Sequence, residues 1–271
     1  MTTGHANDNG VISVMGVFEH TAFVLALIAQ LGVVDPPAEP ANEEAPPAPV
    51  RSLVPFPHPL ITEVLFAVPG SAGDANGDGR RHATGDEFIE LTNPHPEPIS
   101  LTGYRLTDRH GGGEGGFSFT FPELMLRPGE TVVVFNGFEQ QWSGPVGDSN
   151  RAPPAGNDRF HGARVFTARA SSKYIALTNT ADFVLLSSPH RVPIQVVVWG
   201  QPDPAPPADV PLIERVTNRP EGSVQRGAAN APLEPHPTID GKPFSPGVPF
   251  VQPPRHADDS PTEQPAPKPG S

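Results

Sequence analysis

The segment DANGDG at residues 74–79 has the residue types and the spacing of a cation-binding loop. Asp74, Asn76 and Asp78 supply oxygens at alternate positions before a glycine, as in the first half of an EF-hand calcium loop. The twelfth position of an EF-hand carries a bidentate acid, but here that position is Gly85, directly before two acids. The sequence therefore predicts a non-standard calcium site. Its candidate ligands are Asp74, Asn76, Asp78, Asp86 and Glu87.

The same segment is also typical of a metal-free turn between two strands. Asp and Asn side chains cap their own backbone in such turns, and glycine adopts positive φ without strain. The sequence leaves both alternatives open. It predicts no other cofactor, because the ten histidines show no zinc-ligand spacing and the chain has no cysteine.

Other groups that could carry chemistry lack the rest of a site. Asp86 and Glu90 could act as paired carboxylates, but nothing completes an acid–base site, and an outward or edge position for Glu90 is the alternative. The glycine-rich segment at 111–116 lacks the residues that follow in a phosphate loop, and no serine-hydrolase motif occurs. The sequence predicts a protein that is not an enzyme. The alternative is a metal-dependent hydrolase of phosphoesters or glycans that uses the acidic loop 74–87.

The elements that must position these residues are short strands. Apolar runs of five to eight residues rich in Val, Ile, Phe and Leu alternate with Gly, Pro, Asn and Asp, and no helical period persists after residue 60. This pattern predicts an all-β, antiparallel sandwich. The predicted strands are 61–68, 86–93, 101–108, 117–122, 131–137, 173–179, 182–188 and 194–200, with further short strands at 163–168 and 223–226. In FSFTFP, the rings of Phe117, Phe119 and Phe121 are expected on one face, in the core.

The order and spacing of several motifs resemble the lamin tail domain of bacterial proteins. The motifs are ITEVL from residue 61, DANGDG from 74, DEFIELTN from 86, LTGYRLTD from 101, LRPGETVVVF from 126, LTNTADFVLL from 177 and FSPG from 244. The resemblance implies an immunoglobulin-like β-sandwich over residues 58–250 that serves as a binding or interaction module. In bacteria, such modules often belong to exported or surface proteins.

Composition divides the rest of the chain. Residues 1–35 contain an apolar segment that predicts an atypical signal or an anchor helix, and residues 11–34 could associate with a membrane. A plain amphipathic or packing helix is the alternative. Residues 36–57 are rich in Pro, Ala and Glu and predict a linker, and residues 251–271 predict a disordered proline-rich tail.

The charge limits the partners. The formal net charge of −12 disfavours nucleic acid, which needs a surface rich in Lys and Arg. We therefore expect a non-catalytic binding or scaffolding module whose partner is a protein or a cell-envelope component. An exported or envelope location is expected, with a cytoplasmic one left open, and the sequence does not fix the oligomeric state.

Overall fold

The structure of the chain, a computed structural model, describes residues 51–250 except residues 112, 114, 218 and 219. The predicted apolar segment 1–35, most of the linker and the tail 251–271 lie outside these residues. The strands are β1 (Leu60–Leu65), β2 (Phe88–Thr92), β3 (Ile99–Ser100), β4 (Arg105–Thr107), β5 (Ser118–Thr120), β6 (Met125–Leu126), β7 (Thr131–Phe135), β8 (Arg164–Thr167), β9 (Asp182–Ser187), β10 (Pro193–Trp199), β11 (Leu212–Val216), β12 (Val224–Arg226) and β13 (Leu233–Pro235), and one 3-10 helix spans Asp158–Phe160.

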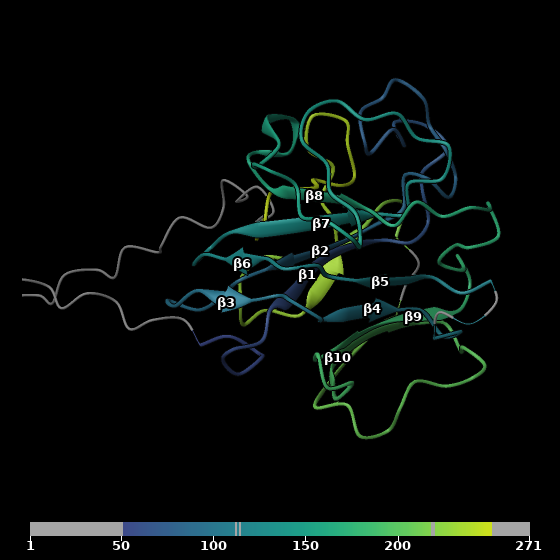
Figure 1. Ribbon diagram of the computed structural model, residues 1–271. Coiled ribbons are helices and arrows are strands. Elements are labelled where there is room, and N and C mark those ends of the chain that lie inside the picture. Colours follow the sequence, from purple (N-terminus) through teal and green to yellow (C-terminus); the bar gives the residue numbers. More distant parts are fainter. Residues whose placement is uncertain (1–50, 112, 114, 218–219, 251–271) are drawn as a thin grey trace, which may run out of the picture. The chain divides into compact units, whose positions relative to one another are not determined.

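The strands form two main sheets that face each other (Figure 1). The first has the order β13-β12-β1-β2-β7-β8, and the second has the order β11-β10-β9-β4-β5. The strands β3 and β6 pair separately. Most pairs are antiparallel, but the edge pairs β7–β8 and β10–β11 are parallel, because residues 136–163 and 200–211 return the chain across the sheet before each edge strand. This arrangement confirms the predicted all-β, immunoglobulin-like sandwich.

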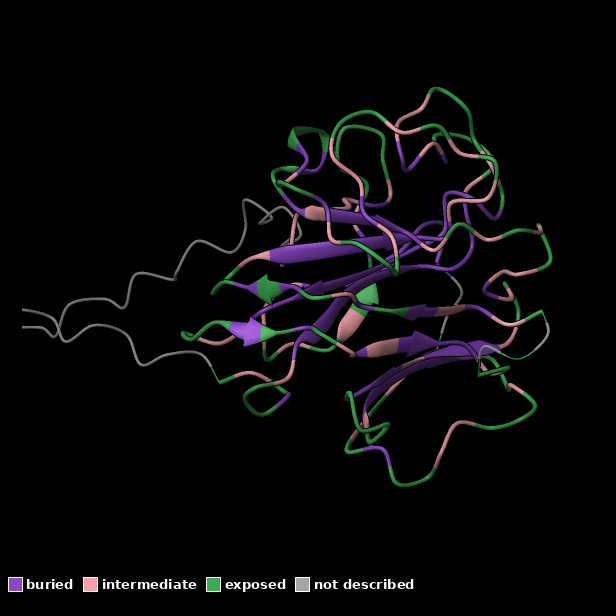
Figure 2. Cartoon of the chain, viewed as in Figure 1, coloured by how far each residue is buried: buried purple, intermediate pink, exposed green. Residues whose placement is uncertain are grey.

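The main core lies between the two sheets. Alternate side chains of β1, β2 and β7 face inward and meet those of β4, β5, β9 and β10. Phe66 stacks on Trp199 with 4.1 Å between ring centroids, and Phe119 and Phe121 pack edge-to-face against Phe166. The long strands β1, β2, β7, β9 and β10 are therefore buried along nearly their whole length, and purple marks buried residues in Figure 2.

A second core covers the opposite face of the first sheet. It contains Leu65, Phe88 and Phe135 from the strands, together with Phe160 and Phe244 from loops. The loops that supply this cover lie above β7 and β8 in Figure 1, among them the C-terminal loop drawn in yellow. We call residues 236–248 the strap, because they cross this outer face. The central strands β1, β2 and β7 of the first sheet are thus buried on both faces.

Some predicted elements differ from the structure. The segment 173–179 is not a strand; side chains fix its backbone instead, since Asn136 Nδ2 donates to the Ile175 carbonyl and Leu177 N donates to Glu87. The strand expected at 223–226 exists as β12, but it lies between β1 and β13 and is not an edge. The sequence did not predict β3, β6, β11 or β13.

Candidate functional site

Asp86 organises the loop that the sequence singled out. Its Oδ1 accepts hydrogen bonds from Ala75 N at 2.9 Å and Asn76 N at 3.0 Å, and its Oδ2 accepts one from His82 N at 2.6 Å. Burial raises the pKa of this carboxyl, and the three backbone donors act in the opposite direction. Asp86 therefore joins both ends of the loop to the start of β2.

The other loop acids cap the backbone of the loop itself. Asp74 accepts from Asp78 N at 3.0 Å and from Gly79 N at 2.8 Å. Asp78 accepts from Arg80 N at 2.8 Å and from Gln141 N at 3.0 Å, and Asn76 Oδ1 also accepts from Asp78 N. These are the contacts of a turn closed by Asx side chains, in which the oxygens that calcium would need already have partners.

Glu87 lies apart from the other four candidate ligands. Its Oε2 accepts from Leu177 N at 3.0 Å, a partner that none of the other four shares. Burial raises the pKa of Glu87 well above its usual value, and the charges of Asp182 and Asp108 raise it further. Across the described part of the chain, no three His, Asp or Glu groups are arranged to hold a metal ion. The hydrogen bonds favour the metal-free turn, and calcium stays a prediction.

The most unusual acidic group is a pair that the sequence analysis did not identify. Glu63 of β1 and Glu90 of β2 are opposite each other in the antiparallel register, and both are fully buried on the outer face of the first sheet. A β-bulge between Ile61 and Glu63 turns the Thr62 side chain to this face as well, where its Oγ1 donates to Glu90 Oε1 at 2.7 Å. The pairing of Asp86 with Glu90 that the sequence left possible does not occur, because the two side chains have different partners, and Glu90 is buried rather than outward-facing or at an edge.

The strap supplies most of the remaining donors to this pair. Ser245 N donates to Glu63 Oε1 at 2.9 Å, and Gly247 N donates to Glu90 Oε2 at 2.7 Å. The Ser223 hydroxyl also donates to Glu63 Oε1. A side chain at position 247 would collide with the Phe160 carbonyl, and the φ of Gly247 is +93°, so this close approach requires glycine.

Burial makes both carboxyls weak acids. It raises the pKa of Glu63 to about 7, against the effect of the donors Ser223 and Ser245. It raises the pKa of Glu90 to about 8, and the neighbouring charge of Glu63 adds to this shift. The described ion pairs join other groups and include neither carboxyl. The pair therefore holds protons near neutral pH without a basic partner.

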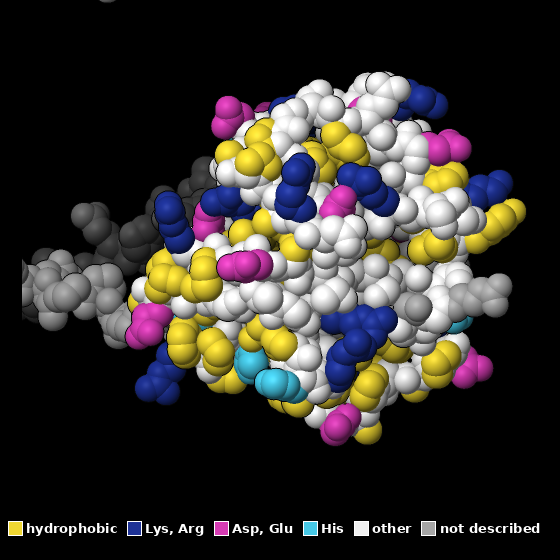
Figure 3. Space-filling model, in the orientation of Figure 1, with side chains coloured by type: hydrophobic (Ala, Val, Ile, Leu, Met, Phe, Trp, Pro, Cys, Tyr) yellow, Lys and Arg dark blue, Asp and Glu magenta, His cyan; other side chains and the backbone are white. Residues whose placement is uncertain are grey.

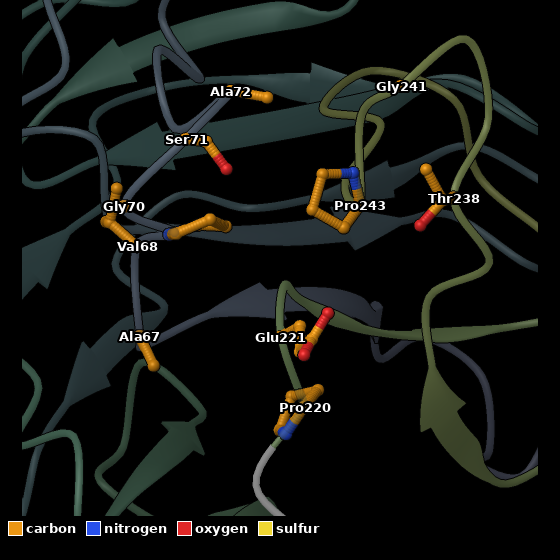
Figure 4. A pocket seen from close by; sticks show the side chains of 11 residues that line it. Ala67, Val68, Gly70, Ser71, Ala72, Pro220, Glu221, Thr238, Gly241 and Pro243 are labelled. Atoms are coloured by element: carbon orange, nitrogen blue, oxygen red, sulfur yellow. The ribbon is translucent and has the colours of Figure 1, made fainter.

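Two hollows flank the strap. One has a volume of about 530 Å³ and lies between the loop 74–77, the 3-10 helix and the strap, with Arg159, Lys242 and the apolar side chains of Ile239 and Phe244 in its wall. The other has a volume of about 580 Å³. Figure 4 shows its small side chains from 67–72 facing Pro243 and Thr238 of the strap, with Glu221 pointing into it. The wall of the first hollow includes Ser245, whose Oγ lies 2.8 Å from His236 Nε2. The Nδ1 of this histidine is bonded to the Pro237 carbonyl and not to an acid, so the described residues form no Ser–His–acid triad here.

Two loop histidines, His58 and His236, form hydrogen bonds within the domain. His236 Nε2 lies 2.8 Å from Ser245 Oγ, and the His236 Nδ1 is bonded to the Pro237 carbonyl. His58 Nδ1 lies 2.8 Å from the Tyr104 hydroxyl. Burial lowers the pKa of both histidines. His58 and His236 therefore have fixed partners within the domain.

The described residues include no helix long and apolar enough to cross a membrane, and residues 11–34 lie outside them. No curated protein matches the chain. A protein-family profile described as Lamin Tail Domain matches residues 58–200, which is more than half of the 271 residues and includes the acidic loop and the Glu63–Glu90 pair. With its sandwich fold and this match, the chain belongs to the lamin tail domain family.

Proposed function

We propose that this protein is a non-catalytic binding module that acts at the cell envelope or outside the cell, with a protein or an envelope component as its partner. The observation that carries the proposal is the use of the acidic side chains. Asp74, Asp78, Asp86 and Glu87 all accept hydrogen bonds from backbone amides of the domain itself. Acids committed in this way stabilise loops and are not free to activate water or a substrate.

The layer of loops on the outer face of the first sheet is the contact surface that the geometry favours. Binding residues often lie on loops that a rigid sheet positions. The wall of the 530 Å³ hollow combines basic side chains with exposed apolar groups such as Ile239. Figure 3 shows the same mixture of basic and apolar side chains over β7 and β8. A mixed surface of this kind suits a folded or extended polypeptide better than a nucleic acid.

Site-specific photocrosslinking tests the proposal. A benzophenone amino acid is introduced at Ile239, in the wall of the hollow, and at Met125 as a control, since both side chains are exposed. We expect a crosslinked adduct of one defined mass from position 239 and none from position 125. Cell fractionation and N-terminal sequencing of the mature protein test the location.

Catalysis would contradict this function. The purified chain is incubated with nitrophenyl phosphodiesters and nitrophenyl glycosides in the presence of Ca²⁺, Mn²⁺ or Zn²⁺. We expect no turnover above the buffer rate. Turnover that the substitutions Asp74→Asn and Asp78→Asn abolish would establish the hydrolase alternative instead.

A further inference from the structure

The strap rests on two carboxyl groups that cannot both ionise easily. Glu63 and Glu90 lie on neighbouring strands with the strap as their cover, so a second negative charge in this site would be neither solvated nor neutralised. The strap itself contributes two backbone amides, Ser245 N and Gly247 N, to the pair.

None of the described charged side chains near the pair bonds to it. On β12, the Arg226 guanidinium bonds to the Ile61 carbonyl and to Glu214. Directly before β7, Glu130 forms an ion pair with Arg164 of β8. On the strap, Asp240 and Lys242 line the hollow, and on its far side Arg159 bonds to the Gly77 carbonyl. His236 approaches the pair only through Ser245.

The strap has few other backbone links to the domain. Pro243 O accepts from Ser223 N at 2.9 Å, and His236 N donates to Ser223 O at 3.0 Å. The remaining backbone bonds of the strap are internal, between Ile239 and Lys242 and between Ser245 and Val248. Local opening of the strap would therefore leave every strand pair of the two main sheets in place.

We propose that the strap is a pH-sensitive cover, closed over the outer face while the Glu63–Glu90 pair keeps its protons and released when the pair loses them. Opening hydrates the two carboxylates and removes one wall from the 530 Å³ hollow. The release is driven by differential solvation, since the charged pair is stable in water and unstable under the strap.

The direction of the pH effect follows from the protonation states. The pKa values of about 7 for Glu63 and about 8 for Glu90 lie above those of exposed glutamates. The two carboxyls therefore bind protons more tightly when the strap is closed than when it is open. Closure is favoured at and below neutral pH and weakens as the pH rises from 7 to 9. On the acid side, burial lowers the pKa of His236, whose Nε2 lies 2.8 Å from Ser245 Oγ, so this histidine adds no charge beside the strap at neutral pH.

Hydrogen exchange measured by mass spectrometry on the full chain tests the proposal. Protection factors, corrected for the intrinsic exchange rate at each pH, are compared for peptides from the strap and from β2 and β7. We expect the strap to show lower protection than the strands at each pH, and its protection to fall at least tenfold between pH 6.5 and 9. Glu90→Gln should weaken this pH dependence, because the amide oxygen still accepts from Gly247 and carries no proton to lose, which leaves only Glu63 to titrate under the strap.

Three further variants complete the test. Glu63→Gln removes the other titrating group and should also weaken the dependence, and the double variant should abolish it. Glu123→Gln alters an exposed acid and should leave the dependence unchanged. Equal protection of strap and strands at every pH would mean that the pair is exposed only by global unfolding. That result, or a wild-type strap whose protection does not change with pH, overturns the proposal.

Discussion

At the scale of the residue, buried acids in this domain accept hydrogen bonds mainly from backbone amides. Asp86 accepts three of them, and Asp182 accepts from Arg109 N, Thr178 N and Phe183 N. Such charge-assisted bonds are stronger than neutral ones and satisfy loop amides that have no partner in a sheet. Acidic residues thus fix the loops of a chain that has no disulfide to do so.

Arg226 is a fully buried basic residue, and we expect its removal to lower the free energy of unfolding. This fully buried guanidinium binds the carbonyls of Ile61 and Ala231 and the carboxylate of Glu214, so it joins β12 to β1 and to the edge strand of the other sheet. Arg226→Ala leaves Glu214 without its cation, and we expect a loss of about 3–5 kcal/mol in the free energy of unfolding. Urea denaturation measures it.

The exposed Arg127 provides the matched control for this substitution. Arg127→Ala should change the free energy of unfolding by no more than about 0.5 kcal/mol. An Arg226→Ala protein as stable as the control would show that the buried ion pair contributes little.

At the scale of the element, the alternation of apolar and polar residues was enough to predict a strand that buries one face. The predicted face of Phe117, Phe119 and Phe121 is confirmed, since each ring is at most 2% exposed. The pattern failed for β11, because Glu214 faces inward to meet Arg226 and interrupts the apolar alternation. Two-residue strands such as β3 carry too few positions for any pattern.

The candidate site, too, was predicted from the sequence only in part. The acidic loop was found from its spacing, but its oxygens proved to be bonded to backbone amides. The sequence analysis did not identify Glu63, although an acid within the apolar run ITEVLF indicates a buried carboxyl that needs partners. Its bond to Ser245 spans 182 positions of the chain, and no local pattern reports a contact of that range.

The loop 74–86 provides a test at this scale. Because its oxygens already have amide donors, we expect the melting temperature of the protein to be unchanged by EDTA and by added Ca²⁺. A calcium ion bound at a hundredfold excess over its Kd would add about 2.7 kcal/mol, or roughly 5–10 °C. Differential scanning calorimetry distinguishes these outcomes, and a shift of that size on chelation would restore calcium as a ligand of the loop.

At the scale of the whole molecule, acids outnumber bases, and several of the acids are buried. The full chain carries a formal net charge of −12, so raising the pH adds charge of the sign already in excess. Burial raises the pKa values of Glu63, Glu87 and Glu90 in the folded state. Both effects make the folded state bind more protons than the unfolded state near neutral pH.

The free energy of unfolding should therefore fall as the pH rises from 6.5 to 9. A carboxyl whose pKa is raised by folding contributes stability that is complete below its unfolded value, 4.5, and is lost as the pH passes its folded value, about 7 for Glu63 and about 8 for Glu90. The loss expected from these two groups is on the order of 2–3 kcal/mol. Urea denaturation at several pH values measures it.

The window above pH 6.5 separates this effect from that of the histidines. His58 and His236 have lowered pKa values, so they reduce stability only as the pH falls below the unfolded value of 6.5. Glu90→Gln should make the fall in stability above pH 6.5 smaller, leaving the part due to Glu63 and Glu87, and the exposed Glu123→Gln should not change it. A stability that rises between pH 6.5 and 9 would mean that the two buried carboxyls ionise without cost, and the protonated pair would then have no role in holding the outer face closed.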